Sequence, residues 1–484
     1  MNINQKAFSG VKWTSLSTII IAISALVKIS VLARFLDASD FGIMALVSFI
    51  LGFMDLFMDM GITSAILHTQ NIRKEEYSSL YWLNVGFSFL LFILILLISP
   101  IIANFYNEPE LNKLMSIAGL AIIFSAVGRQ YKTIFQKNLK FKKIAIIDIT
   151  VIIIALISAI IFAVRGFGVY SLVFSALIQY ALGNLTYFIL GNHNQPLMFH
   201  FNYKETEPFL KIGVYQVGGQ VVNYFNRDLD VLIIGKFFGS ELLGGYSLAK
   251  QLVRRPLSII DTVINKVAIS ILPRFQSDNR SLLRYFNILI SGLGLINALV
   301  YGIMAIGAPL IINILYGSEY LSIINLVRIF TIVIYFRSIS GLVGILSITK
   351  GRTDIEFYWN IIIMTLFPIV ILIGVNINLI GVITLIALTQ VVLIVPSWFM
   401  FYNKLLDMPF RGYIKKVFFP FTISALLFSG FYISNNNTSF TFQILWSLFL
   451  FVALFVYAVL TENKLRVLVI NYKQKYAKFF TRNK

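Results

Sequence analysis

The chain has 484 residues, of which 58% are hydrophobic and only 13% are charged, and its mean hydropathy is +0.83. A soluble domain carries about a quarter charged residues, so this composition excludes an ordinary soluble protein. The chain has no cysteine, which excludes a disulfide framework and thiolate chemistry. A net charge of +19 in a soluble protein indicates nucleic-acid binding. In a membrane protein, basic loops between the spans explain it, and the positions of the basic residues decide between the two.

Apolar segments of about twenty residues, long enough for a helix to cross a bilayer core, recur along the whole chain. We predict fourteen spans: 12–33, 41–66, 80–103, 113–134, 144–164, 168–190, 209–235, 241–268, 284–314, 320–347, 357–375, 378–402, 415–434 and 441–461. Lys28 and Arg34 follow the first apolar run in place of a small-residue cleavage site, so we expect this segment to be retained as a helix. The expected fold is an all-α membrane protein.

The basic residues fall mainly in alternate connections between these spans. Of the 40 Lys and Arg residues, 28 lie on the side that holds both termini and four lie on the other side, with the remaining eight inside the spans. Basic loops face the cytoplasm, so both termini are expected to be cytoplasmic and the membrane to be the bacterial inner membrane. The basic segment 463–484 either lies along the membrane surface as an amphipathic helix or serves only as a topology anchor.

A short motif occurs twice. The run Ala33-Arg34-Phe35-Leu36 reaches Gly42, and the run Gly235-Lys236-Phe237-Phe238 reaches Gly244, at an offset of 202 residues. An even number of helices separates the copies, which predicts two lobes of six helices with the same orientation, a parallel repeat. We therefore predict an N-terminal lobe at 1–202, a second lobe at 203–408, and an additional helix pair with a basic tail at 409–484.

Charged residues also occur inside the spans. A cation facing lipid at mid-bilayer costs about 2.5–3.5 kcal/mol, so these side chains must face one another or a water-filled interior. Seven of the eight cations lie in the second half, against three acids. Guanidinium groups suit phosphate recognition, and we predict an anionic-headgroup site formed by Lys28, Arg227, Lys250, Arg254, Arg255, Arg328 and Arg337. The alternative is internal salt bridges, such as Arg227 with Asp230.

Two acids, Asp55 and Asp59, lie one helical turn apart in the second span. They are candidates for a site that binds a coupling proton or Na⁺, and the alternative is a structural pair with Lys28. No phosphate-binding loop occurs in the sequence, and the three histidines are not clustered with other ligand types. We expect no catalytic site, no metal and no cofactor.

Several short runs of the sequence form a recognisable set: Gly10-Val11-Lys12-Trp13, Leu32-Ala33-Arg34-Phe35-Leu36, Asp59-Met60-Gly61, Tyr81-Trp82-Leu83-Asn84, Gly166-Phe167-Gly168-Val169-Tyr170 and Gly244-Gly245-Tyr246. These runs resemble those of the Wzx-type polysaccharide exporters, which share a superfamily with MATE antiporters and peptidoglycan-precursor flippases. The colanic acid and teichuronic acid exporters are the branch that the chain resembles most. The resemblance implies a two-lobed bundle that moves an undecaprenyl-pyrophosphate-linked oligosaccharide, with Lys28, Lys250, Arg254 and Arg255 holding the headgroup.

The expected function is thus a flippase for a lipid-linked polysaccharide repeat unit, acting by alternating access beside a polysaccharide polymerase and export machinery. A lipid II flippase, a MATE-like antiporter of cationic drugs and a membrane-embedded glycan polymerase are the alternatives. The short non-cytoplasmic connections leave little room for an active site of the last kind.

Overall fold

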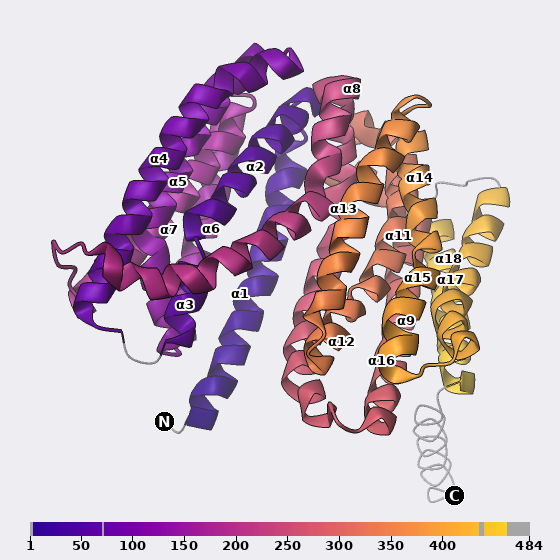
Figure 1. Cartoon of the computed structure of the whole chain (residues 1–484). Helices are drawn as coiled ribbons and strands as arrows, with labels where there is room; N and C mark the ends of the chain where they lie inside the picture. Colours follow the sequence, from indigo (N-terminus) through magenta and orange to yellow (C-terminus); the bar gives the residue numbers. More distant parts are fainter. Residues whose placement is uncertain (1–2, 70–71, 435–439, 462–484) are drawn as a thin grey trace, which may run out of the picture. The chain divides into compact units, whose positions relative to one another are not determined.

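The computed structural model describes residues 3–69, 72–434 and 440–461, and nearly all of these residues are helical, with no β-strand among them (Figure 1). Within the same ranges, thirteen helices are long and apolar enough to cross a membrane. The prediction of an all-α membrane protein is confirmed. The predicted behaviour of the tail 463–484 lies outside the described residues.

The helices form two compact units. Unit 1 contains Met1–Leu248, Leu315–Glu319 and Trp359–Val382, and unit 2 contains Ala249–Ile314, Tyr320–Tyr358 and Ile383–Lys484. The lobe boundaries predicted at 202/203 and 408/409 stay a prediction.

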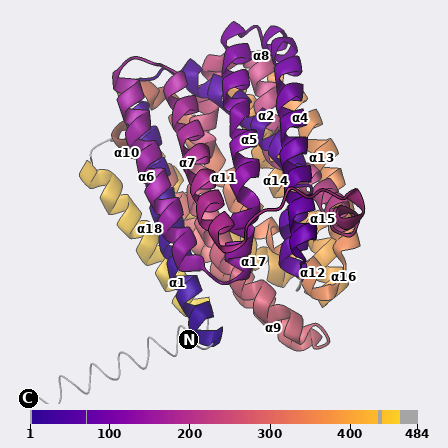
Figure 2. The same ribbon diagram turned by 90° about the vertical axis from the view of Figure 1, so that its left-hand side faces the viewer.

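Unit 1 is a bundle organised around α5. Its helices are α1 (Ile3–Leu32), α2 (Ala38–Asp59), α3 (Ile62–His68), α4 (Lys74–Tyr106), α5 (Pro109–Lys137), α6 (Phe141–Val164), α7 (Tyr170–Asn194) and the first part of α8 (Tyr203–Ile271). Helix α5 packs between α4 and α7, as Figure 2 shows, and α6 packs against α1 and α7. The buried face of α5 includes Ala118, Gly119, Ala121, Ser125 and Ala126, small residues that let neighbouring helices approach closely.

Unit 2 is organised around α9. Its helices are the last part of α8, the 3₁₀ turn η1 (Leu272–Phe275), α9 (Asn279–Ile306), α10 (Ala308–Leu315), α11 (Ile324–Ser340), α12 (Leu342–Lys350), α15 (Ile394–Ser397), the π-helical η3 (Trp398–Asn403), α16 (Lys404–Leu406), α17 (Phe410–Ile433) and α18 (Phe440–Thr461). The 3₁₀ segment η2 (Ser318–Ile323), α13 (Thr353–Val375) and α14 (Leu379–Val392) are divided between the units: most of α13, the start of α14 and the start of η2 belong to unit 1. Helix α9 packs against α11, α17 and α18. Its buried small residues at helical spacing, among them Ser291, Gly294 and Ala298, permit this packing.

Helix α8 explains why thirteen apolar helices correspond to fourteen predicted spans. The apolar part of α8, Val217–Thr262, counts as one candidate span of 46 residues. It is broken at Gly239, whose φ of 77° and ψ of 178° are not helical, and this break falls between the predicted spans 209–235 and 241–268. The polar first part of α8 runs across unit 1 (Figure 1), so the first of these spans begins later than predicted.

The two copies of the repeated motif contact each other within unit 1. A Cβ atom at Gly42 would collide with the backbone carbonyl of Ser240, and a Cβ atom at Gly244 would collide with that of Ala38. Ala38 and Ser240 are themselves 202 residues apart, so the two contacts are reciprocal. A hydrogen bond of 2.7 Å between the hydroxyls of Ser39 and Ser240 lies beside them. This symmetry supports an internal duplication.

Candidate functional site

Lys28 lies on α1 and reaches α7. Its ammonium group donates a hydrogen bond of 2.6 Å to the hydroxyl of Ser175, which in turn donates to the carbonyl of Leu172. The lysine is half-buried, so it is a cation inside the helix bundle of unit 1 rather than a residue that extends to a surface.

Asp55 and Asp59 of α2 meet an arginine that the sequence analysis did not count among the intramembrane charges. The guanidinium group of Arg129, on α5, forms a salt bridge with Asp55, lies 3.9 Å from Asp59, and donates to the hydroxyl of Ser125 at 3.1 Å. Thr63 also donates to Asp59. The alternative pairing of these acids with Lys28 is wrong, because Arg129 is their partner and Lys28 bonds to Ser175.

A second polar group in unit 1 joins α5, α6 and α7. The ammonium group of Lys132 lies 2.9 Å and 3.0 Å from the two carboxylate oxygens of Asp148, and Tyr187 donates to the same carboxylate at 2.8 Å. Arg129 and Lys132 lie near the end of the predicted span 113–134. Basic residues at the end of a span are counted with the adjoining connection, so these two were not included among the charges inside the spans. The three acids inside neighbouring spans, Asp55, Asp59 and Asp148, are the signal that could have placed Arg129 and Lys132 in the membrane, since Lys28 was the one basic partner considered for the first two and none was considered for Asp148.

Arg227 lies on α8 in unit 1. Its Nε donates to Asp228 at 2.6 Å, and its guanidinium group lies 5.1 Å from the ring centre of Tyr224. Asp230, the partner considered in the sequence analysis, accepts a hydrogen bond from Tyr246. The Arg227 side chain is 45% exposed.

Unit 2 brings several of the predicted headgroup residues together. Asp261 of α8 interacts electrostatically with Arg254 of the same helix and with Arg337 of α11. Lys250 is only 7% exposed, whereas Arg254 and Arg255 are half-buried. The i, i+4, i+11 spacing of Lys250, Arg254 and Asp261 places these three on one face of α8. Arg254, Asp261 and Arg337 are thus within electrostatic range of one another. We call these residues, together with the neighbouring cations Lys250 and Arg255 of α8, the α8–α11 cluster.

Arg328, also on α11, faces other helices. Its guanidinium group lies 5.4 Å from the ring centre of Phe428 and 5.7 Å from that of Tyr432, both on α17, and its Nε donates to the carbonyl of Ala305 on α9 at 3.4 Å. It lines a small cavity with Tyr301 and other residues of α9, α11 and α17. The structure thus places Arg328 against the additional helix pair.

The groups described above can bind anions. Among the described residues, no group of three or more His, Asp or Glu side chains could hold a metal ion. What the chain does provide is buried and half-buried cations on membrane-spanning helices. Such groups can hold phosphate or carboxylate oxygens by charge-assisted hydrogen bonds.

The fold is that of a known class of membrane transporters. A structure described as the lipid II flippase MurJ in an inward closed conformation superimposes with a TM-score of 0.75 at 16% identity, over 94% of this chain and 99% of that one. The Vibrio cholerae MATE transporter VcmN superimposes with a TM-score of 0.56 at 11% identity, over 84% of this chain and 97% of that one. At these identities the likeness shows the fold alone.

The sequence profile of the family described as "Polysaccharide biosynthesis protein" matches residues 31–325. This match covers more than half of the chain, so the protein belongs to the polysaccharide biosynthesis protein family. It is 28% identical over 426 residues to the lipopolysaccharide biosynthesis protein WzxC of Escherichia coli K12, covering 88% of this chain and 86% of that protein. It is 27% identical over 448 residues to the teichuronic acid biosynthesis protein TuaB of Bacillus subtilis 168 (91% and 92%), and 32% identical over 307 residues to the amylovoran biosynthesis protein AmsL of Erwinia amylovora (62% and 78%). The resemblance inferred from the sequence runs is confirmed.

Proposed function

We propose that this protein flips an undecaprenyl-pyrophosphate-linked oligosaccharide, the repeat unit of a surface polysaccharide, across the cytoplasmic membrane by alternating access. It binds and moves its substrate without covalent chemistry. The observation that carries the proposal is the α8–α11 cluster, because its cations lie on membrane-spanning helices where a charge facing lipid is costly.

A pyrophosphate headgroup matches this cluster. Arg254, Arg255 and Arg337 offer planar guanidinium groups, which bind phosphate oxygens through two parallel hydrogen bonds, and Lys250 adds a point charge. These side chains also have interactions within the chain, so binding exchanges internal partners for phosphate oxygens. Lys28 and Arg227, which lie in unit 1, and Arg328, which lies on α11, stay predictions as headgroup residues.

The names of the relatives support a glycan cargo. They refer to the biosynthesis of lipopolysaccharide, teichuronic acid and amylovoran, three different polysaccharides from three bacteria. These glycans differ in their sugars. The cations of this protein would then recognise the lipid carrier rather than a particular sugar.

The charge distribution supports an orientation. The excess of Lys and Arg in alternate connections supports cytoplasmic termini and a location in the bacterial inner membrane. In that orientation the protein would receive its substrate from the cytoplasmic leaflet and deliver it to a polymerase and an export machinery on the other side.

Asp55 and Asp59 are the proposed coupling site. In this conformation Arg129 pairs with Asp55 and lies close to Asp59, and a proton or Na⁺ that binds these carboxylates would weaken their contact with Arg129. A change in this α2–α5 contact would link ion binding to helix movement, because α2 packs directly on α5.

The test of the proposed function is a double variant, Arg254→Ala with Arg255→Ala, in a strain that depends on this protein for its surface polysaccharide. Lipid-linked repeat units should accumulate inside the cell and surface polysaccharide should be lost. The matched control, Arg280→Ala with Arg284→Ala, removes two exposed cations at the start of α9 and should export normally. Full export by the first variant would refute the assignment of the headgroup site.

Lipid II transport is the second candidate, favoured by the superposition on MurJ. Its substrate has the same pyrophosphate carrier, so the α8–α11 cluster does not discriminate between them. Complementation of a strain depleted of its lipid II flippase would favour it. A MATE-like activity requires a cavity that accepts cationic drugs, and the basic cluster opposes this by repulsion.

A further inference from the structure

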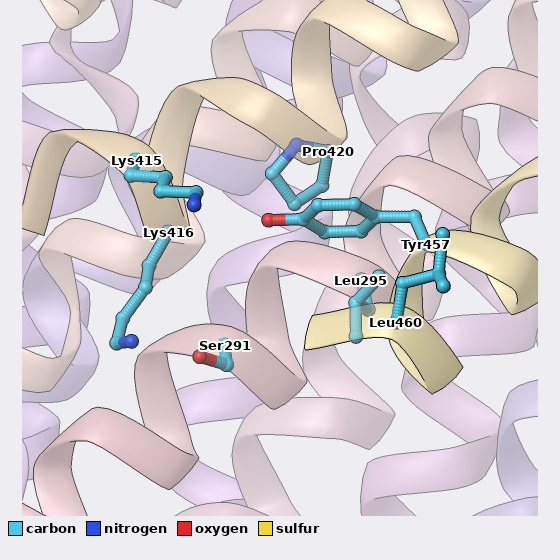
Figure 3. Close-up of a pocket in the computed structure, with 7 residues that line it drawn as sticks. All are labelled: Ser291, Leu295, Lys415, Lys416, Pro420, Tyr457 and Leu460. Carbon is cyan, nitrogen blue, oxygen red and sulfur yellow. The ribbon is translucent and has the colours of Figure 1, made fainter. Parts of the chain in front are cut away.

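A cavity of about 310 Å³ lies among α9, α17 and α18 of unit 2, apart from the α8–α11 cluster. Seven residues line it (Figure 3): Ser291, Leu295, Lys415, Lys416, Pro420, Tyr457 and Leu460. Its volume is at the lower end of the range for small-molecule sites. None of its lining residues belongs to the proposed headgroup or coupling sites.

The cavity has a polar side and an apolar side. Figure 3 shows the ammonium groups of Lys415 and Lys416 on one side, with the hydroxyls of Tyr457 and Ser291 directed toward them. Leu295 and Leu460 lie on the other side. The lining therefore offers two cations and two hydroxyl groups next to a hydrocarbon surface. This combination suits the binding of an amphiphilic anion.

The backbone shapes this cavity. Pro420 lies inside α17 and has no N–H, so the carbonyl of Lys416, four residues earlier, lacks its usual helical partner. A Cβ atom at Gly294 would come within 2.8 Å of that carbonyl, which shows how closely α9 approaches α17 there. The ring of Tyr457 stacks on Phe419 at 4.7 Å, which fixes the tyrosine at the edge of the cavity.

Lys415 and Lys416 bring two adjacent positive charges to the polar side of the cavity. In residues 3–69, 72–434 and 440–461, neither Lys415 nor Lys416 forms a salt bridge. Adjacent like charges repel, and a bound anion relieves that repulsion while accepting hydrogen bonds from both ammonium groups.

We propose that this cavity binds the phosphate group of an anionic membrane lipid. The lipid chains would follow the exposed apolar surface of α18, where Val452, Val456 and Leu460 are 53%, 48% and 69% exposed. A soluble anion would leave Leu295 and Leu460 in contact with water, so the apolar side favours a lipid. If the proposed orientation holds, the beginning of α17 is cytoplasmic and the lipid comes from the cytoplasmic leaflet.

The experiment measures lipid binding to the purified full-length protein by native mass spectrometry. The probes are phosphatidylglycerol, polyprenyl phosphate and inorganic phosphate. Wild-type protein should retain a phosphate-bearing lipid that inorganic phosphate at equal concentration does not displace. In a competition between phosphatidylglycerol and polyprenyl phosphate, the lipid that displaces the other is the source of the bound phosphate.

Two variants locate the binding. Lys415→Gln with Lys416→Gln should weaken lipid binding roughly 30-fold, since a basic residue near an anionic lipid surface contributes about fivefold. Leu295→Trp should also reduce binding, because it fills the cavity without changing charge. Arg274→Gln with Lys404→Gln removes two exposed cations of unit 2 outside the cavity and should bind as wild type does.

Unchanged binding in both cavity variants would overturn the proposal, as would displacement of the lipid by inorganic phosphate. If the lysine variant does not fold, the Leu295→Trp result decides. The assay measures resident lipid and requires no transport, so it can fail while the proposed flippase function stands, and the reverse is equally possible.

Discussion

Gly42 and Gly244, 202 residues apart in equivalent positions of the repeated motif, each lie against the backbone of the other copy. A side chain at Gly42 would meet the carbonyl of Ser240, and one at Gly244 would meet the carbonyl of Ala38. The duplicated sequence is thus matched by a duplicated contact. In unit 1 this contact joins α2 to the part of α8 that follows the break at Gly239.

The first prediction follows from this contact. Gly42→Ala or Gly244→Ala should destabilise the protein by about 1–3 kcal/mol, because the added methyl group forces two closely packed backbones apart. Thermal unfolding in detergent measures the effect. Gly86→Ala is the control, since a Cβ atom at Gly86 meets nothing within 4 Å, and its unfolding temperature should not fall. Equal effects at Gly42 and Gly86 would contradict the close approach.

The sequence predicted the fold well because membrane spans and basic loops are set by composition over about twenty residues. The break at Gly239, between two predicted spans, is the clearest case. The pairing of charges was less predictable. Arg129 lies 74 residues from Asp55, and only the packing of α5 on α2 brings them together. Arg328 was grouped with Arg254 and Arg337 by charge alone, whereas its ring contacts are with α17, which no local pattern encodes.

The second prediction separates a coupling pair from a structural pair. If Asp55 and Arg129 form the coupling site, Asp55→Asn should abolish transport and leave the fold intact. Asp148→Asn should instead lower stability, because the amide has no charge to pair with Lys132 and one acceptor oxygen in place of the two that Lys132 and Tyr187 use, while transport continues in the protein that folds. Transport and thermal unfolding, measured on both variants, test this contrast. Normal transport by Asp55→Asn would remove Asp55 from the mechanism.

The third prediction is a double-mutant cycle for the same pair, Asp55 and Arg129. Asp55→Asn, Arg129→Gln and the double variant should show a coupling free energy of about 1 kcal/mol or more, as expected for contacting charges. The equivalent cycle for Asp55 and Lys28 should give a value near zero, since Lys28 bonds to Ser175. A larger coupling with Lys28 than with Arg129 would contradict the observed pairing.

The fourth prediction concerns Asp261, the carboxylate that interacts with Arg254 and Arg337. It competes with an anionic ligand for both guanidinium groups. Asp261→Asn should therefore raise the affinity for polyprenyl pyrophosphate roughly fivefold, or about 1 kcal/mol. Titration of the purified variant against wild type measures the change, and a weaker affinity would show that Asp261 supports the site rather than competing in it.

The fifth prediction concerns pH and the beginning of α8, outside the membrane spans. A hydrogen bond of 2.7 Å from Ser79, followed by the contact with His200, holds the pKa of Glu205 below its ordinary value of 4.5. The folded state favours the ionised form, so this stabilisation is present above pH 4.5 and is lost as the pH falls toward the lower folded pKa. Amide hydrogen exchange of 203–209 should accelerate over that range. In Glu205→Gln the acceleration should disappear, and its persistence would assign the effect to another group.

In the proposed function, the α8–α11 cluster binds the pyrophosphate headgroup while the protein moves the lipid-linked glycan across the membrane. The most direct measurement uses purified protein in vesicles that contain an undecaprenyl-pyrophosphate oligosaccharide, with a glycan-specific reagent added outside. Wild-type protein should expose the inner-leaflet glycan to the reagent, and Arg254→Ala with Arg255→Ala should leave it protected, as in protein-free vesicles. Equal exposure by the wild type and the double variant would contradict the role of the cluster, and protection with the wild type under every imposed ion gradient would contradict the proposed function.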